Sequence, residues 1–176
     1  MLKGEKVILR AREREDLKRL HELQRNVDLV LLGDGNWQPE PFESYEKNFE
    51  KHLADEEKSY FVIEVDGVVI GSIGLHHSNR LDGNSEFGIG IYDPDYVGKG
   101  YGSDAIMVLL RWAFRIQNYR RIWLTTAADN PRSIAAYEKC GFIHEGRLRE
   151  HIFSDGQYVD FVHMGMLRSE WEARQG

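Results

Sequence analysis

The chain has 176 residues, of which 41% are hydrophobic, and its 29 acidic side chains outnumber 23 lysines and arginines to give a formal net charge of -6. A chain of this length removes about 70% of its extended surface from water on folding, which is enough for one well-filled core. We therefore expect a single domain over residues 1–176. The negative charge disfavours a general nucleic-acid binder, because a phosphate backbone selects surfaces rich in lysine and arginine. It is compatible with a cationic small substrate.

Two features bear on the cellular compartment. No stretch approaches the roughly 20 apolar residues of a membrane span, and the opening MLKGEKVILR lacks the apolar segment of a signal peptide. A single cysteine cannot form an internal disulfide, which favours a reducing compartment. The sequence therefore predicts a cytoplasmic protein without a membrane partner.

The first third of the chain mixes short strands with charged helices. Residues 7–10 predict a strand, and leucines at every third position within residues 14–26 predict a surface helix. Residues 28–42 contain two glycines and two prolines without a steady period, and predict a loop or a pair of helical turns. Ser44 is the expected N-cap of a second helix that ends near Glu56.

The middle of the chain begins with a hairpin signal. Residues 60–65 and 68–75 are rich in β-formers and are joined by Asp66-Gly67, which supplies the positive φ of a two-residue turn. A further strand follows at residues 85–91. Residues 103–117 are apolar on nearly all sides, which predicts a helix packed into a sheet.

The last part predicts a strand, a capped helix and a hairpin. Residues 121–126 favour a strand, Asn130-Pro131 predicts a helix start, and Gly141 the end of that helix. Residues 142–153 and 157–167 predict an antiparallel hairpin. The expected fold class is mixed α+β, with a central, largely antiparallel twisted sheet of about six or seven strands flanked by about four helices.

The loop before the buried helix carries the clearest chemical signal. Gly98, Gly100 and Gly102 alternate, so side chains are missing where consecutive amide N–H groups can converge on an anion at the positive end of a helix. The Walker and dinucleotide motifs do not fit, since Gly100 is followed by Tyr and Ser103 stands where the dinucleotide fingerprint needs Gly. The loop predicts a phosphate-bearing ligand, with a flexible turn that binds nothing as the alternative.

Two blocks of the sequence resemble the GCN5-related N-acetyltransferase (GNAT) family. VGKGYGSDA at residues 97–105 resembles its Gln/Arg-x-x-Gly-x-Gly/Ala pyrophosphate signature, and ADNPRSIAAYEKCGF at residues 128–142 resembles its Asn-x-x-Ser…Tyr-x-Lys-x-Gly-Phe block. The opening and closing segments resemble the branch of ribosomal-protein and spermidine acetyltransferases. Val97 departs from the pattern, because the family usually has Gln or Arg there.

The resemblance implies acetyl-CoA as cosubstrate and direct attack by a primary amine of a polyamine, a small molecule or a protein N-terminus. The pantetheine arm is expected along the backbone near Ile91 and Asp93, where N–H groups would stabilise the oxyanion. Asn130 and Ser133 of the second block are expected cofactor contacts. The residues expected around the diphosphate are consecutive: Val97, Gly98, Lys99, Gly100, Tyr101, Gly102 and Ser103.

Amine acetylation needs a base, because an amine with a pKa near 10.4 is neutral in only about one molecule in 2,500 at pH 7. Glu86 is the first candidate, since histone-acetylating relatives have a catalytic Glu at a similar offset from the loop; the alternative is an exposed structural carboxylate. His76 and His77 are the other candidate bases, of which at most one should face the site. We expect no metal, because the remaining histidines give no short ligand spacing.

The resemblance also implies that Tyr137 donates a proton to the departing thiolate, whereas Cys140 is expected to be a small buried hydrophobe. The acceptor pocket is expected from residues 28–42, the second helix and the terminal hairpin, with aromatic walls and acidic groups around a cation. The candidates, beside His76, are Trp37, Phe42, Tyr45, Tyr158 and Phe161, with Asp34, Glu40, Glu43, Glu46 and Asp160.

Two alternative functions stay open at this level. Loss of the usual Gln or Arg at Val97 is compatible with a CoA-binding regulatory module without turnover. An antibiotic-modifying acetyltransferase would share the chemistry and differ only in its acceptor. A homodimer is expected from the resemblance alone.

Overall fold

Strands from both halves of the chain form one sheet. The computed structural model describes residues 1–31, 37–53, 55 and 58–175. In this part of the chain the sheet has eight strands in the order β1-β2-β3-β4-β5-β6-β8-β7. All neighbouring pairs are antiparallel except β5 and β6, which are parallel. The strands are β1 (Leu2–Lys3), β2 (Ile8–Ala11), β3 (Ser59–Val65), β4 (Val68–Asn79), β5 (Asn84–Ile91), β6 (Arg121–Ala127), β7 (Ile143–Ser154) and β8 (Gln157–Leu167).

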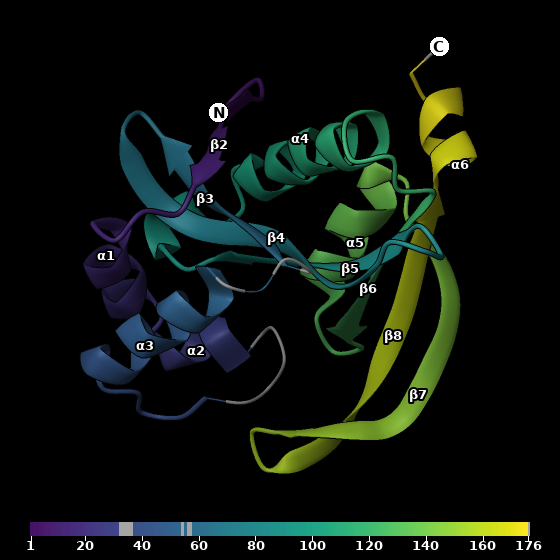
Figure 1. Cartoon of the computed structure of the whole chain (residues 1–176). Coiled ribbons are helices and arrows are strands. Elements are labelled where there is room, and N and C mark those ends of the chain that lie inside the picture. The colour runs from purple at the N-terminus through teal and green to yellow at the C-terminus, as the bar shows by residue number, and fades with distance from the viewer. Residues whose placement is uncertain (32–36, 54, 56–57, 176) are drawn as a thin grey trace.

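Helices cover both faces of this sheet. Figure 1 shows α1, α2 and α3 gathered on one side and α4 with α5 on the other. No helix among the described residues has the length and apolar character needed to cross a membrane. The helices of the described residues are α1 (Asp16–Leu23), α2 (Val27–Leu31), α3 (Phe42–Leu53), α4 (Tyr101–Arg115), α5 (Pro131–Cys140) and α6 (Arg168–Ala173), with a 3-10 turn η1 at Pro94–Tyr96.

The two faces of the sheet bury separate hydrophobic clusters. Ile63 packs in the larger cluster with Leu109 of α4, whereas its neighbour Val62 packs in the smaller one with Leu17 of α1 and Phe49 of α3. Adjacent strand residues point to opposite faces, so β3 contributes to both clusters. The predicted mixed α+β fold with a largely antiparallel sheet is confirmed.

Local capping and turn signals agree with the structure in two places and disagree in one. Asp66 and Gly67 have φ of 49° and 80°, as the predicted hairpin turn requires. Asn130 caps α5 by accepting a hydrogen bond from the Ser133 amide. Ser44 is not an N-cap, because α3 begins two residues earlier, at Phe42.

Pro41 explains the earlier start of α3. Its carbonyl accepts hydrogen bonds from the amides of Ser44 and Tyr45, at 3.0 and 3.1 Å, and so sets the first turn. The Ser44 hydroxyl instead donates to the Glu40 carboxylate, at 3.0 Å. The helix ends at Leu53, and Glu56, its predicted end, lies outside the described residues.

Strands β5 and β6 separate after a short paired stretch. In the part of the chain that the structure describes, residues 84–86 of β5 pair with residues 121–123 of β6. Beyond that point β5 continues beside β4, and β6 continues beside β8. Residues 87–91 therefore have one backbone edge that no strand of the described chain covers.

The hairpin of β7 and β8 projects from the body of the molecule. Figure 1 shows it as a long, curved arm that extends to the bottom of the view. Strand β7 is an edge strand and is exposed along most of its length. Its exposed apolar side chains include Ile143, Leu148 and Phe153, and Tyr158 of β8 is exposed beside them.

Candidate active site

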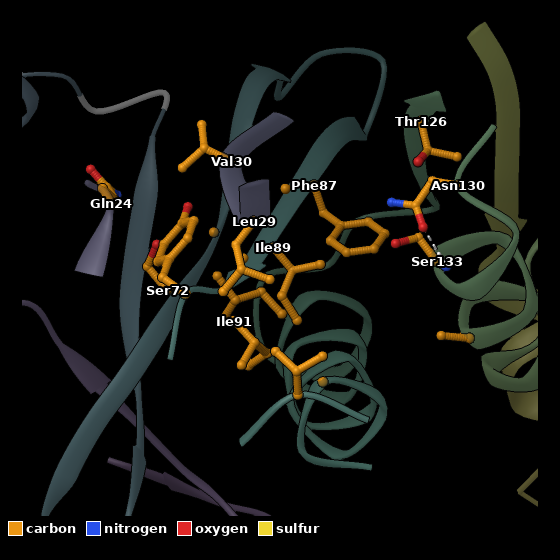
Figure 2. Close-up of a pocket in the computed structure, with 18 of the residues that line it drawn as sticks. Gln24, Leu29, Val30, Ser72, Phe87, Ile89, Ile91, Thr126, Asn130 and Ser133 are labelled. Atoms are coloured by element: carbon orange, nitrogen blue, oxygen red, sulfur yellow. Dashed lines mark hydrogen bonds between the residues drawn. The ribbon is translucent and has the colours of Figure 1, made fainter. Parts of the chain in front are cut away.

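A cavity of about 1530 Å³ opens where β5 and β6 separate. Its walls come from the N-terminal helices at one end and from the starts of α4 and α5 at the other. In Figure 2 the side chains of β5 lie between these two ends. The labelled lining residues are Gln24, Leu29, Val30, Ser72, Phe87, Ile89, Ile91, Thr126, Asn130 and Ser133.

The glycine loop has the geometry of an anion site. Gly98 and Gly100 have φ of 78° and 85°, a region that L side chains rarely adopt. Helix α4 begins directly after Gly100, and no described side chain caps it there. The first amide N–H groups of α4 lack intrahelical acceptors and carry the positive end of the helix dipole, so they are suited to bind an anion.

The loop residues do not all face the cavity. Among the residues predicted around the diphosphate, Lys99 and Tyr101 are absent from the described lining, and the Tyr101 ring packs against Tyr96. The Lys99 carbonyl accepts a hydrogen bond from Lys6 Nζ, at 3.1 Å, so a lysine near the N-terminus lies at this loop. The residues of this set that line the cavity are Val97, Gly98, Gly100, Gly102 and Ser103.

Ile91 and Asp93, the two residues expected near the pantetheine arm, occupy different environments. Ile91 lines the cavity at the open edge of β5. Asp93 is buried, and its carboxylate caps η1 by accepting from the Asp95 amide and forms an ion pair with Arg19, at 2.5 Å. Asp93 therefore fixes the turn between β5 and the glycine loop.

Helix α5 contributes both polar and basic side chains to the cavity lining. Asn130 and Ser133, the cofactor contacts expected from the second block, both line the cavity. Arg132 and Lys139 line it too, and the sequence reasoning missed them. Both lie within residues 128–142, the second block that resembles the GNAT family. Their positive charge could have indicated that they contribute to a phosphate site.

Glu86 lies in the cavity wall at the point where β5 and β6 separate. Its side chain is 12% exposed. Thr125 of β6 donates a hydrogen bond to Oε1, at 3.2 Å, while Oε2 lies 2.8 Å from His77 Nδ1 and 3.5 Å from His76 Nε2. The carboxylate is thus oriented by both neighbouring strands.

The two histidines do not follow simple strand alternation. His76 lines the cavity and His77 is not among its described lining residues, in keeping with the prediction that at most one would face the site. Even so, the His77 ring reaches Glu86, because its φ is 48° and the β4–β5 register shifts between His76 and Asn79. Both imidazoles consequently meet one carboxylate.

Tyr137 lines the cavity from α5. Its ring packs edge-on against Phe87 of β5, with centroids 5.7 Å apart. Burial raises the pKa of Tyr137 to about 12, an effect that the hydrogen bond with Ser133 partly opposes. The phenol is therefore neutral at physiological pH and can donate a hydrogen bond into the cavity. Cys140 is buried, as expected, and burial raises the pKa of its thiol.

The opposite end of the cavity is lined by aromatic and polar groups of the N-terminal helices. Trp37, Glu40 and Tyr45, which are candidates for the acceptor pocket, all line the cavity. Trp37 Nε1 donates to the Gln24 carbonyl, at 3.2 Å. The Tyr45 hydroxyl is buried and has no hydrogen-bond partner among the described residues, and burial raises its pKa to about 12.

Of the remaining predicted acceptor residues on the hairpin and the N-terminal helices, Phe161 alone is among the described lining residues. Tyr158 is 68% exposed and packs against Phe153 on the projecting arm, away from the described lining, whereas Phe161 of the same hairpin does line the cavity. Asp34 lies outside the described residues. Two of the acidic candidates form ion pairs, Glu46 with Arg14 and Asp160 with Arg147. Phe42 packs against the ring of His21. Glu43 is not among the described lining residues.

The cavity lies along the open edge of β5 and is lined by the glycine loop and the uncapped start of α4, an arrangement suited to an extended, phosphate-bearing ligand. Residues 6–143 match the family model of the acetyltransferase (GNAT) domain. The chain belongs to this family and is an acetyl-CoA-dependent N-acetyltransferase that acetylates amines.

Relatives of known structure and name agree with this assignment. The chain is 36% identical to a spermidine N(1)-acetyltransferase of Vibrio cholerae over 93% of its own length and 94% of the relative's. A solved structure of the Vibrio cholerae spermidine N-acetyltransferase with CoA and spermine has a TM-score of 0.89, at 34% identity over 95% of this chain and 98% of that one. A dodecameric structure of that enzyme in an intermediate state has a TM-score of 0.85, at 34% identity over 97% and 99% of the two chains.

Proposed function

We propose that the chain acetylates a polyamine of the spermidine class, with Glu86 as the base and Tyr137 as the donor to the departing sulfur. The observation that carries this proposal is the partly buried Glu86 carboxylate, which lies in the same cavity as Tyr137, at the end of the paired stretch of β5 and β6. Named relatives that act on spermidine support the choice of acceptor.

The proposed reaction starts with removal of a proton from the ammonium. At pH 7 the neutral form of an alkylamine lies about 4.6 kcal/mol above the charged form. Glu86 accepts that proton directly or through water, and the neutral nitrogen then attacks the thioester carbonyl. The new C–N bond forms while the C–S bond breaks, the nitrogen gives up its second proton to the departing thiolate or to water, and amide N–H groups at the open edge of β5 stabilise the oxygen.

Tyr137 acts on the leaving group. The pKa of Tyr137 is about 12, well above the value of about 8.5 for an ordinary thiol. Complete proton transfer from the phenol to the thiolate is therefore unfavourable, and we assign Tyr137 a hydrogen bond to the sulfur as charge develops.

The cofactor is proposed to bind with its diphosphate at the glycine loop and its pantetheine arm beside residues 87–91. Val97 lines the cavity without offering a polar side chain, so the diphosphate would depend on backbone N–H groups. Arg132 and Lys139 add positive charge nearby. The acceptor would enter from the other end, past Glu40 and Trp37.

Thiol release tests this proposal. The chain is incubated with acetyl-CoA and a panel of spermidine, putrescine, an aminoglycoside and a peptide with a free N-terminus. We expect release above background with spermidine, and a slower rate with Tyr137→Phe. Release only with the peptide or the aminoglycoside would contradict the polyamine assignment.

We also propose that the chain self-associates in the cytoplasm. The dodecameric relative and the exposed apolar side chains of the projecting β7–β8 arm support self-association. The lone, buried Cys140 is compatible with a reducing compartment.

A further inference from the structure

His76, His77 and Glu86 form a potential ligand set that amine acetylation does not require. Each offers one ligand atom, and the three atoms all lie within 4.8 Å of one another. We propose that this cluster binds one divalent transition metal of borderline softness, with Zn²⁺ as the best fit, and that the bound metal inhibits the enzyme. The inhibitory part rests on the proposed role of Glu86 as base; the binding part does not.

The distances are close to those of a metal site. Glu86 Oε2 lies 2.8 Å from His77 Nδ1 and 3.5 Å from His76 Nε2. Nitrogen and oxygen ligands lie about 2.0–2.2 Å from zinc, so neighbouring atoms of a tetrahedral set lie about 3.3 Å apart. The two rings lie close together, with centroids 5.1 Å apart and an interplanar angle of 71°.

The backbone holds this arrangement at a conformational cost. A non-glycine residue with φ near +48° is uncommon, and His77 adopts it just where the β4–β5 register shifts. Residues held in such sparsely populated backbone conformations cluster at functional positions. This backbone conformation of His77 brings a second imidazole to the Glu86 carboxylate.

Thr125 orients the Glu86 carboxylate toward the two histidines. Its hydroxyl donates to Oε1, at 3.2 Å, and so leaves Oε2 directed at the imidazoles. Hydrogen bonds that orient a ligating oxygen contribute to affinity in metal sites. The site is also reachable, since 75% of the His77 side chain is exposed and His76 lines the cavity.

The donor set selects among metals. Two imidazoles and one carboxylate suit zinc, copper or nickel, whereas magnesium and calcium prefer oxygen ligands. Three protein ligands leave a fourth position for water. A cation held by Glu86 would neutralise the carboxylate, which could then no longer accept the proton of the substrate.

Spacing along the sequence predicted no metal, because it considered histidines alone. The third ligand comes from the neighbouring strand, where Glu86 is the register partner of His76. The pairing of a histidine with a glutamate across the β4–β5 hairpin would have indicated the site, but spacing within one strand does not reveal such a pairing.

Calorimetry tests the binding. The full-length, untagged chain is stripped of metal with a chelator, transferred to chelator-free buffer and titrated with ZnCl₂. We expect one site, weakened by about tenfold or more in Glu86→Gln and in His77→Asn. Asparagine tolerates positive φ, so His77→Asn removes the imidazole with little effect on the fold. The matched control is His144→Ala, which removes an exposed histidine that pairs with Glu138, and should bind zinc like the parent chain.

Either of two results would overturn the site: no saturable binding, or binding that His77→Asn leaves unchanged while its thermal transition matches the parent's. Thiol release measured in parallel separates the two proposals. An active chain that binds no zinc overturns only the metal site. A chain that binds zinc through these residues but acetylates no amine leaves the site in place and removes the proposed role of Glu86. We expect the inhibitory zinc concentration to rise about tenfold in His77→Asn relative to the parent chain.

Discussion

The Glu86 carboxylate contacts Thr125, His76 and His77. The substitution Glu86→Gln removes its charge and keeps nearly the same side-chain shape. Gln keeps the hydrogen bond from Thr125 but cannot take a proton. We expect kcat to fall by about 10²- to 10⁴-fold, the usual contribution of a general base, with little change in the Kd for CoA. Steady-state thiol release and CoA calorimetry measure the two quantities. Glu138→Gln, on the exposed side of α5, serves as the control. A normal kcat in Glu86→Gln would exclude the residue as the base.

Two buried tyrosines predict a loss of stability at alkaline pH. Burial raises the pKa of Tyr137 and of Tyr45 to about 12 each, above their unfolded value of about 10. A folded pKa above the unfolded one gives stability that is complete below pH 10 and is lost as the pH rises through 12. Each unit of difference corresponds to about 1.4 kcal/mol.

Urea denaturation at several pH values measures this effect. We expect the free energy of unfolding to fall more steeply between about pH 10 and 12 in the parent chain than in Tyr137→Phe. Tyr158→Phe, at a tyrosine that is 68% exposed, should keep the parental slope. Equal slopes in all three chains would show that Tyr137 titrates normally.

At the scale of the elements, the glycine loop allows a matched test. Gly98 and Gly67 have nearly the same φ, 78° and 80°, and a Cβ added at either position would meet no other atom within 4 Å. Alanine at either place forces a left-handed conformation that costs about 1–2 kcal/mol. We expect both Gly98→Ala and Gly67→Ala to lower the free energy of unfolding by similar amounts, but only Gly98→Ala to weaken CoA binding, by about tenfold. Similar CoA affinity in both variants would contradict the anion site.

Elements with local signals were the predictable ones. The turn at Asp66-Gly67 and the cap at Asn130 follow from single residues, so their elements were placed correctly. Strand β1 is two residues long and α6 follows β8 directly, so neither has a periodic pattern of useful length. Helix α6 is fixed by a tertiary contact instead, between Trp171 and Phe114, with ring centroids 5.6 Å apart.

The two ends of the cavity differed in predictability for the same reason. The end at the glycine loop is built from one contiguous loop and one helix start, so most of its lining residues could be found from glycine spacing and the resemblance. The end at the N-terminal helices depends on tertiary packing, which the sequence pattern does not specify. On the β7–β8 hairpin, Phe161 lines the cavity and Tyr158 is not among its described lining residues, a difference that depends on the length and curvature of the arm.

At the scale of the whole molecule, the projecting arm predicts an assembly. We expect light scattering to give a mass several times that of the 20.5 kDa chain. Leu148→Glu, on the exposed strand β7, should reduce that mass, because a charge would be buried in an apolar contact. Leu81→Glu is the control, since Leu81 is 96% exposed on the turn between β4 and β5. A monomeric parent chain would contradict self-association.

The parting of β5 and β6 has a consequence beyond catalysis. Without the cosubstrate, residues 87–91 of β5 pair with β4 on one edge, and no strand of the described chain pairs with the other edge. A compound that binds only the folded chain adds about 2.7 kcal/mol of stability at a concentration 100-fold above its Kd. We expect starved cells, with little acetyl-CoA or CoA, to hold the enzyme in a form that proteases cleave sooner. The lifetime of the protein would then follow the acetyl supply.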